Sequence, residues 1–452
     1  MLTHARGLGS GLVIALLTLA TPGAQQPAVK STKLALVGGM LLDGYEAPAI
    51  HHAAILIDGD RIVRVGPAAE ITIPPDYTIV DTSGRTMMPG MIDLHAHLII
   101  LGHGNYGTWF PWVAKQGSGM LTRVMETSAR QLLNAGVTSA VDLGAPLTES
   151  LSVRDRINTG EIPGPRMSMS GPWITRSAGG MTDQFGGISI TGSGQAAEEV
   201  EKLAKAGVDV IKAHAGLTRE DYTAIAGTAH RHNLRVHAHV YAETDVRNAL
   251  ETGIDVLTHA GSAGTAPPYS KQLIIDIVNA GRPVVITAAH RAWVYPDTAA
   301  FPERLQDPAL RRDLPAAIYA EVQDSLRHWR ALGYFGRTDR EMIFRENGVK
   351  QFTDSGTVLG MGTDSGTPMN FHGEALRREA KVHVDMEMPA IKVISALTRV
   401  GANILGKQRD LGTIEPGKLA DIIVVQGNPL YDITALAHVE TVVKGGRVFK
   451  QR

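Results

Sequence analysis

The sequence predicts an α/β protein, with a (β/α)₈ TIM barrel and a small β-sandwich domain formed by both chain ends. Three observations lead to this fold class. Short β-like runs gather near both ends of the chain, the middle alternates short apolar runs with helix-length amphipathic segments, and polar residues follow several of those apolar runs. The length of 452 residues, of which 44% are hydrophobic and 20% charged, suits one large barrel with a small companion domain.

Residues 1–24 are predicted to be a signal peptide. His4 and Arg6 precede an apolar core at 11–20, and small residues follow at 21–24. This core is too short to cross a bilayer, which takes about 20 residues. We therefore expect an exported protein, periplasmic or secreted, with no membrane segment in its mature form. Cleavage after Ala20 or after Ala24 fits equally.

The β-rich flanks, residues 25–90 and 407–452, are expected to form one composite sandwich. The first holds runs such as Leu34–Val37, with Gly and Asp turns between the runs, and the second holds Asp421–Val425 and Val439–Val443. The alternative is two unrelated hairpin pieces.

The middle of the chain, residues 91–406, is predicted to form the barrel. Eight apolar runs are expected as its strands: Met91–His97, Ser139–Leu143, Arg166–Ser170, Val208–Ala213, Arg235–Val240, Val256–His259, Pro283–Thr287 and Val358–Thr363. Helices are expected between them at Gly119–Leu133, Ala196–Lys205, Arg219–His232 and Thr244–Glu251. The long stretch 291–347 must be an insertion over the barrel mouth or a set of extra helices.

Charge and cysteine content exclude several kinds of site. Lys and Arg number 44 against 45 for Asp and Glu, so a nucleic-acid or anionic-membrane partner has no electrostatic support. There is no cysteine, which excludes disulfides, a thiol nucleophile and thiolate ligands. A metal site in this chain must use histidine, carboxylate or a modified lysine.

The first predicted strand ends in a pair of histidines. His95 and His97 stand at i and i+2, so in a strand both imidazoles share one face. Two surface histidines would give the same pattern, but these follow an apolar run, Pro89–Leu94, that must be buried. A site at the carboxyl end of the strand is therefore favoured, because barrel chemistry gathers at that face.

Other strand ends carry similar side chains. Lys212 ends the fourth strand, His259 the sixth and Asp364 the eighth. A lysine at the end of a buried run must be paired, neutralised or modified, because an isolated buried ammonium is costly. Several polar residues at equivalent strand positions favour a metal site over a set of unrelated rim residues.

Strand five offers two candidate ligands, because the side chains of His237 and His239 point to the same face of the strand. His239 lies nearer the carboxyl rim and is preferred, which would make His237 a buried supporting residue. His214, after strand four, is expected to support a ligand and not to be one.

The chain resembles the amidohydrolase superfamily, near its imidazolonepropionase-like and Xaa-Pro dipeptidase-like branches. The resemblance runs from about Leu34 to the C-terminus and rests most on two segments, Met88–His97 and Gly412–Asp421. It implies two divalent metal ions, most simply Zn²⁺. In this chain the implied ligands are His95, His97 and Asp364 for one metal, His239 and His259 for the other, and a carboxylated Lys212 as the bridge.

The resemblance also implies a mechanism in which a metal-bridging hydroxide attacks a carbonyl while Asp364 acts as general acid and base. Tyr241 and His290, which follow strands five and seven, are candidate substrate-contacting catalytic residues; the alternative for Tyr241 is a rim residue. Arg176, Arg291 and Arg377 are candidates to hold a substrate carboxylate. The aromatic segment Tyr106–Trp112 is placed on the loop after strand one, as a substrate wall or as packing for that loop.

The expected reaction is hydrolysis of an amide bond in a small molecule that bears a carboxylate: a dipeptide, an N-acyl amino acid or an amino-acid conjugate such as an aryl-amide toxin. The alternatives are a cyclic amide, a lactone or a phosphotriester cleaved at the same site, since a fold does not choose between them. A non-catalytic scaffold is disfavoured because every implied ligand position is filled. The resemblance further implies a homo-oligomer.

Overall fold

The computed structural model describes residues 33–262, 268–290, 302–328, 331–332 and 338–450. The expected signal peptide at 1–24 and the candidate Arg291 lie outside these ranges.

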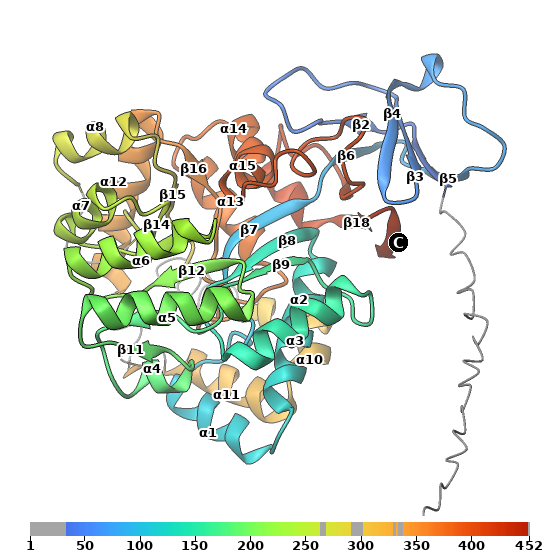
Figure 1. The fold of residues 1–452 in the computed structure, drawn as a ribbon. Helices are drawn as coiled ribbons and strands as arrows, with labels where there is room; N and C mark the ends of the chain where they lie inside the picture. Colours follow the sequence, from blue (N-terminus) through green and yellow to red (C-terminus); the bar gives the residue numbers. More distant parts are fainter. Residues whose placement is uncertain (1–32, 263–267, 291–301, 329–330, 333–337, 451–452) are drawn as a thin grey trace, which may run out of the picture. The chain divides into compact units, whose positions relative to one another are not determined.

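Strands from the two ends of the chain pair with each other. A four-stranded sheet has the order β4-β3-β1-β5, and a five-stranded sheet has the order β19-β18-β17-β6-β2. Their bounds are β1 Lys33–Val37, β2 Met40–Leu41, β3 Ala53–Asp58, β4 Arg61–Pro67, β5 Thr78–Asp81, β6 Arg85–Pro89, β17 Ile422–Gln426, β18 Val439–Lys444 and β19 Arg447–Lys450. The second sheet joins the ends because β17 runs antiparallel to β6, with Ile423 opposite Met88. Figure 1 shows the C-terminus beside the N-terminal strands.

One apolar cluster combines side chains of both sheets. Leu36 and Ile55 of the N-terminal strands are packed in it with Ile422, Val424 and Val443 of the C-terminal strands, and all five are buried. The two ends of the chain therefore stabilise each other by burying a shared apolar surface.

All eight predicted barrel strands are present and parallel to their neighbours. They are β7 Met91–Ala96, β8 Val137–Asp142, β9 Arg166–Met169, β12 Val210–Ala213, β13 Arg235–His239, β14 Val256–Thr258, β15 Val284–Val285 and β16 Leu359–Gly360. Every residue of β7, β8 and β12 is buried, as expected of parallel strands covered on both faces. Two short strands that the sequence did not predict, β10 Ile174–Thr175 and β11 Ile188–Ser189, lie between β9 and β12 in the chain.

These strands form two hydrogen-bonded sheets, β7-β8-β9 and β11-β10-β12-β13-β14-β15-β16. Backbone bonds link them at both sides: Leu94 N–H donates to Met361 O at 2.9 Å, and Asp209 N–H donates to Met169 O at 2.9 Å. Helices lie around the outside of the strands in Figure 1. The architecture is a TIM-barrel-like α/β fold.

The four predicted helices are confirmed as α2 Met120–Asn134, α5 Ser193–Ala206, α6 Arg219–Arg231 and α7 Glu243–Glu251. α6 begins with a capping box, in which the Thr218 and Asp221 side chains each accept from the other's backbone N–H. Apart from α1, which is described below, the other helices that the structure describes outside the insertion are η1 Ala68–Glu70, α3 Leu147–Asn158, α4 Met181–Gln184, α8 Lys271–Asn279, α13 Ala375–Asp385, α14 Ala390–Ser395, η4 Ala396–Val400, α15 Gly401–Ile404 and η5 Ile433–Ala437.

The insertion between β15 and β16 forms extra helices in its described part. They are η2 Pro302–Gln306, α10 Pro308–Asp313, α11 Ala316–Arg327 and α12 Thr338–Ser355. Of the two expectations for residues 291–347, this part fits the helical one.

The aromatic segment after the first strand is a helix, α1 Tyr106–Lys115, and its assignment to a loop was wrong. Asn105 caps the helix by accepting from Gly107 N–H at 2.8 Å. Tyr106, Trp109, Phe110 and Val113 repeat at the i, i+3, i+4, i+7 spacing of a helix face. Trp109 is fully buried and donates from Nε1 to Ile99 O at 3.2 Å, so this residue packs the helix against the fold.

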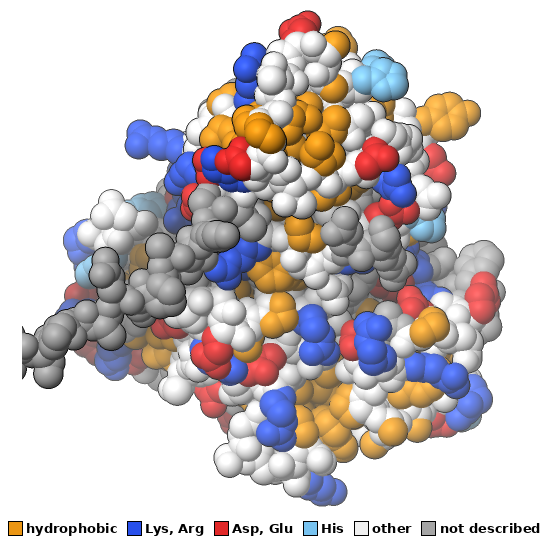
Figure 2. All heavy atoms as spheres, turned by 90° about the vertical axis from the view of Figure 1, so that its right-hand side faces the viewer, with side chains coloured by type: hydrophobic (Ala, Val, Ile, Leu, Met, Phe, Trp, Pro, Cys, Tyr) orange, Lys and Arg blue, Asp and Glu red, His pale blue; other side chains and the backbone are white. Residues whose placement is uncertain are grey.

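The surface carries charges of both signs. Figure 2 shows Lys and Arg interspersed with Asp and Glu on the face that it presents, with apolar side chains gathered near its top. Exposed apolar residues of the N-terminal strands include Val63 and Ile79. Among the described residues, no helix has both the length and the apolar character to span a membrane.

Candidate active site

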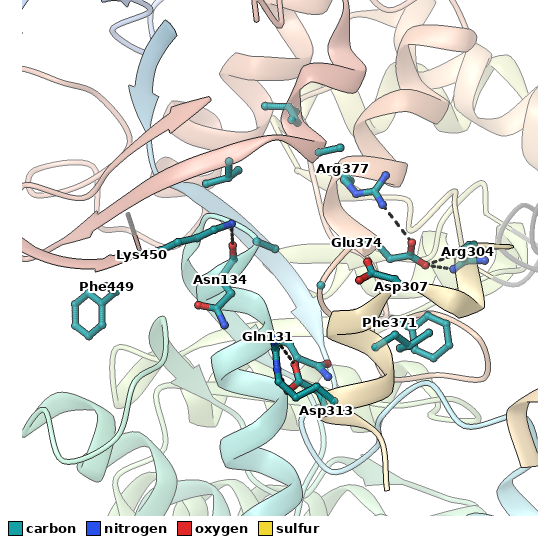
Figure 3. Close-up of a pocket in the computed structure, with 17 residues that line it drawn as sticks. Gln131, Asn134, Arg304, Asp307, Asp313, Phe371, Glu374, Arg377, Phe449 and Lys450 are labelled. Atoms are coloured by element: carbon teal, nitrogen blue, oxygen red, sulfur yellow. Dashed lines mark hydrogen bonds and ion pairs between the residues drawn. The ribbon is translucent and has the colours of Figure 1, made fainter. Parts of the chain in front are cut away.

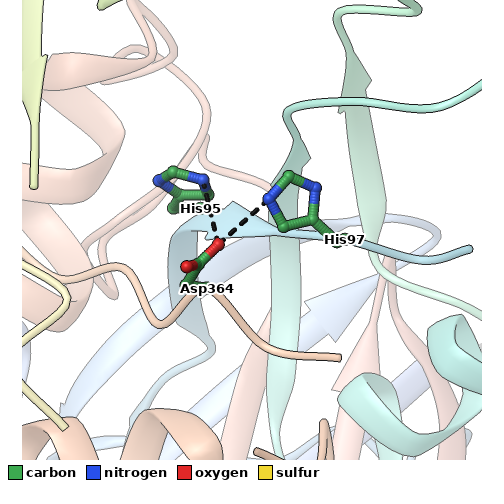
Figure 4. A group of neighbouring side chains, drawn as sticks. All are labelled: His95, His97 and Asp364. Carbon is green, nitrogen blue, oxygen red and sulfur yellow. Dashed lines mark ion pairs between the residues drawn. The ribbon is translucent and has the colours of Figure 1, made fainter. Parts of the chain in front are cut away.

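His95 and His97 of the first barrel strand meet Asp364 beyond the last one. The Nε2 atoms of His95 and His97 lie 3.4 Å and 3.0 Å from the same oxygen, Oδ1 of Asp364, as Figure 4 shows. All three side chains are buried. The i, i+2 spacing on β7 therefore places both imidazoles on one face, as the sequence predicted.

Asp364 is held in this position by its backbone. Its N–H donates to His95 O at 2.8 Å, and its φ is +57°, a left-handed conformation that is uncommon for a residue other than glycine. His259 has the same feature, with φ +68°. Such strain is kept where surrounding contacts impose it, often at functional sites, and no sequence pattern revealed it here.

His239 and His259 extend the cluster beyond the first three residues. Their ring centroids lie 4.4 Å apart, and the His259 ring lies 4.6 Å from that of His95. His259 Nδ1 is 2.8 Å from Thr287 Oγ1. The two predicted groups of ligands are therefore neighbours at one end of the parallel strands.

Burial sets the protonation of these groups. It lowers the pKa of His95 and His259 well below the usual value, and nearby positive charge adds to the effect: mainly Lys212 for His95 and His239 for His259. Both rings are then neutral at pH 7, the form that binds a metal. Burial by itself would raise the pKa of Asp364, but His290, His97 and His95 hold it well below its usual range.

Lys212 lies fully buried on β12. Its Nζ donates to Thr258 Oγ1 at 3.0 Å, and that hydroxyl donates to Ala238 O at 2.6 Å. Burial lowers the lysine pKa to about 7, against the opposing effect of Asp364. A large fraction of this amine is therefore uncharged at neutral pH.

The two histidines of β13 differ in environment. His237 is fully buried, and neither of its ring nitrogens has a hydrogen-bond partner among the described residues. His239 is partly exposed, and its ring lies near those of His214 and His259 at 4.4 Å each. These positions favour His239 as the ligand and His237 as a core residue.

Tyr241 and His290 both border this cluster. The Tyr241 ring lies 4.8 Å from that of His239 and 5.5 Å from that of His259. His290 Nδ1 is 3.2 Å from the second carboxylate oxygen of Asp364, Oδ2. Both candidates are therefore close enough to contact a substrate held at the cluster.

The residues fit a divalent metal ion. One ligand atom from each of His95, His97 and Asp364 lies within 4.8 Å of the others, in a buried setting. Neutral imidazole and carboxylate are the donors that Zn²⁺ takes in the absence of cysteine.

An aromatic stack that the sequence did not predict borders His97. Phe185, after α4, stacks on Trp173 with ring centroids 4.8 Å apart, and Trp173 stacks on His214 at 4.4 Å. Tyr106 and Phe110 of α1 meet the Phe185 ring at 6.0 Å and 5.2 Å. The exposed sides of Tyr106 and Phe110 leave part of the aromatic segment available as a substrate wall.

Asp93 is a second residue that sequence reasoning missed, although it stands in the motif that ends in His95. Its fully buried carboxylate accepts from His95 N–H at 3.1 Å and from the Thr363 hydroxyl at 2.7 Å. It thereby ties β7 to the residue before Asp364. A charged residue inside an otherwise apolar strand was the available signal.

Of the candidate arginines, the two that the structure describes, Arg176 and Arg377, are paired with carboxylates. Arg176 makes a two-point ion pair with Asp221, at 2.6 and 3.0 Å. Arg377 donates to Glu374 at the wall of a cavity of about 490 Å³, which Figure 3 shows. None of the site histidines lines that cavity, so we do not assign it to the site.

Comparison with known proteins shows the family of the chain. The Amidohydrolase family matches residues 86–449. The chain is 24% identical to the ochratoxinase of Aspergillus niger, over 92% of this chain and 86% of that protein. It is 38% identical to the imidazolonepropionase of Cereibacter sphaeroides, but over only 22% of this chain and 26% of that protein.

A solved structure of a Xaa-Pro dipeptidase with bound methionine aligns with a TM-score of 0.73 and 21% identity, covering 92% of this chain and all of that one. This likeness supports the fold. The match to the family covers most of the chain, and it confirms the resemblance inferred from the two motif segments. The chain belongs to the amidohydrolase family and is a hydrolase that acts on amide bonds.

Proposed function

We propose that this protein is a binuclear metal-dependent amidohydrolase that cleaves an amide bond of a small substrate bearing a carboxylate. A dipeptide, an N-acyl amino acid or an aryl-amide conjugate of an amino acid meets this description. The observation that carries the proposal is the convergence of His95, His97 and Asp364 with His259 and His239 at one end of the parallel strands.

In this proposal His95, His97 and Asp364 hold one metal and His239 and His259 hold the other. Zn²⁺ suits these donors best. The depressed pKa of His95 and His259 supports the assignment, because these rings need not lose a proton at pH 7 before binding.

Lys212 is proposed to bridge the metals as a carbamate. Its uncharged amine would add to CO₂, forming an N–C bond and releasing one proton, which leaves a carboxylate on the side chain. Two features support this role: the pKa of about 7 supplies the reactive amine, and full burial would otherwise leave a costly ammonium.

The metals, when bound, would supply a water of lowered pKa as nucleophile and would polarise the scissile carbonyl. Asp364 would accept a proton on its carboxylate and pass it to the leaving amine nitrogen. Its low pKa keeps the group in the carboxylate form at neutral pH. Tyr241 and His290 would contact the carbonyl oxygen or hold the substrate beside it.

The substrate class is supported by the relatives. One is named ochratoxinase, and one solved structure is named a Xaa-Pro dipeptidase. The partly exposed aromatic rings of Tyr106 and Phe110 suit an apolar acyl group next to His97.

A cyclic amide is the second candidate substrate. The 107-residue match to an imidazolonepropionase favours it. A lactone or phosphotriester would use the same residues.

The wider architecture is also proposed. We infer that the parallel strands close into a (β/α)₈ barrel over 91–406, and that 25–90 and 407–452 form one β-sandwich domain. Backbone bonds at both sheet borders and the β6–β17 pairing support this division. We further propose that residues 1–24 direct export to the periplasm or the exterior, and that the mature protein is a homo-oligomer without a membrane segment or nucleic-acid partner.

The test is a turnover screen of the zinc-loaded protein. Dipeptides and N-acyl amino acids are compared with cyclic amides, lactones and a phosphotriester, beside an Asp364→Asn control. Turnover of carboxylate-bearing amides that the control lacks supports the proposal. Turnover of lactones or phosphotriesters alone overturns the substrate class, and turnover of cyclic amides alone selects the second candidate.

A further inference from the structure

A buried carboxylate on α13 lies behind the site. Glu379 has no exposed surface, and its two oxygens accept from successive backbone amides: Ala288 N–H at 2.8 Å and Ala289 N–H at 2.7 Å. His383, one helical turn later, places Nε2 3.1 Å from Oε1. The carboxylate therefore has three hydrogen-bonding neighbours in a fully buried setting.

The two amides belong to the turn that carries site contacts, residues 287–290. His290 N–H donates to Thr287 O at 3.2 Å, which closes the turn. At its start, Thr287 Oγ1 lies 2.8 Å from His259 Nδ1, and at its end His290 Nδ1 lies 3.2 Å from Asp364 Oδ2. Glu379 thus binds the middle of a short segment whose two ends touch two proposed metal ligands.

The turn needs an external restraint. Thr287 has φ +56°, a strained conformation that a β-branched residue rarely adopts. Hydrogen bonds from Ala288 and Ala289 to a carboxylate are charge-assisted and stronger than bonds to a neutral acceptor. They can hold the backbone in this conformation.

Packing alone does not explain a glutamate at this position. Among the described residues its one ion-pair partner is His383, and no Lys or Arg neutralises it. Burying a carboxylate is costly, and an apolar residue of similar size commonly serves stability as well or better. A specific bonding role for the carboxylate accounts for this choice.

We propose that Glu379 is a positioning residue: it fixes the 287–290 turn, and through it sets the direction of His290 toward Asp364. It touches neither substrate nor metal. The inference rests on the proposed function only for its effect on turnover, since the restraint on the turn is a property of the protein without substrate.

The first test measures the turn itself. In Glu379→Gln one oxygen is replaced by an amide NH₂, which cannot accept from the backbone, so one of the two bonds is lost. Hydrogen exchange at the Ala288 and Ala289 amides of the full chain should quicken about 10-fold, while the strand amides of β14 stay protected. The matched control is Asp385→Asn on the same helix, which breaks only an exposed ion pair with Lys381. Unchanged exchange in Glu379→Gln overturns the proposal.

The second test asks whether Glu379 acts through His290. Glu379→Gln should lower kcat about 10- to 100-fold, with bound zinc retained. In a His290→Ala background the same change should lower kcat less than about 2-fold further, because the two residues act on one path. Losses that multiply in the double variant indicate a general structural role and refute the proposal.

A third variant covers failure of Glu379→Gln to fold. Glu379→Asp keeps the negative charge but moves the carboxylate away from the Ala288 and Ala289 amides, because its side chain is shorter. We expect the same faster exchange at these amides. The loss of kcat should again be smaller in the His290→Ala background than in the wild type. Normal exchange in that variant counts against the proposal. If the wild-type protein turns over no amide, the proposed function fails, yet the exchange result still decides whether Glu379 restrains the turn.

Discussion

The Nε2 atom of His97 lies 3.0 Å from Oδ1 of Asp364, which places the end of the first barrel strand against the residue that follows the last. His95 approaches the same oxygen from the same strand, at 3.4 Å. Two imidazoles and one carboxylate in a buried setting are donors that suit a divalent metal ion. The relationship depends on the parallel neighbours β7 and β16, since only their adjacency brings these distant parts of the chain together.

Replacing the carboxylate of Asp364 should remove both metal binding and proton transfer. In Asp364→Asn we expect turnover to fall about 10²- to 10⁴-fold, the usual contribution of a general acid–base group. Zinc content should fall from two equivalents per chain toward one. Turnover assays and metal analysis check this beside Asp385→Asn, an exposed substitution on α13 that should behave as wild type. Near-normal turnover in Asp364→Asn would exclude the proposed role.

Removing the buried amine tests the carbamate. Lys212→Ala should lose at least one metal equivalent and about 100-fold or more of its activity, because a bridging ligand matters at least as much as the groups that support ligands. Lys381→Ala removes an exposed lysine and is the control. Mass spectrometry of the intact protein under native conditions should show added CO₂ on the wild type and not on Lys212→Ala. Full activity in Lys212→Ala would refute the bridge.

The strand-five ligand is decided by a pair of variants. His239→Asn should lose one zinc equivalent, since this ring faces the His259 ring at 4.4 Å. His237→Asn should keep two equivalents and instead lower the unfolding temperature, because the change alters a fully buried position in the packed core. Metal analysis and thermal unfolding of both variants separate the roles. The reverse pattern would assign the ligand to His237.

Stability should fall in mild acid because of His103. This ring is fully buried against Trp109, with centroids 5.2 Å apart, and burial lowers its pKa from 6.5 to about 3. Between these values the unfolded state binds a proton that the folded state does not. As far as this ring is concerned, the free energy of unfolding has its full value above pH 6.5. It decreases progressively as the pH falls from 6.5 toward 3.

His103→Phe keeps a ring in the stack and removes this titration. Between pH 7 and pH 5 the wild type should lose about 2 kcal/mol more unfolding free energy than the variant. Urea unfolding at the two pH values measures the difference. An equal pH dependence in both proteins would show that the ring is protonated in the fold or hydrated there.

The barrel strands were predictable because each is a short apolar run between helix-length segments, and burial on both faces demands that pattern. The candidate ligands at their ends could be named for a related reason. His95, Lys212, His259 and Asp364 end runs that have to be buried, so each needs a partner, and the fold class places strand ends together. The resemblance to the amidohydrolases supplied which residues are proposed to share a metal.

Other features of the structure correspond to weak sequence patterns or to none. The aromatic segment Tyr106–Trp112 has helical spacing, which its assignment to the loop after strand one did not take into account. The stack of Phe185 on Trp173 joins residues on separate segments, and nothing in their local sequence links them. Asp93 could have been noticed as a charge inside an apolar strand.

By itself the sequence determined which residues must be buried, which polar groups end the buried runs, and therefore the fold class and most of the candidate ligands. These features follow from the periodicity of apolar residues and from the free-energy cost of an isolated buried charge. Both can be recognised within a short stretch of sequence. Only the tertiary structure decided that His239 and not His237 faces the neighbouring ligand ring, that Asp364 and His259 take left-handed backbone conformations, and that Glu379 on α13 binds the turn before His290. These relations arise from contacts between segments far apart in the chain, and the local sequence does not encode their distances or directions.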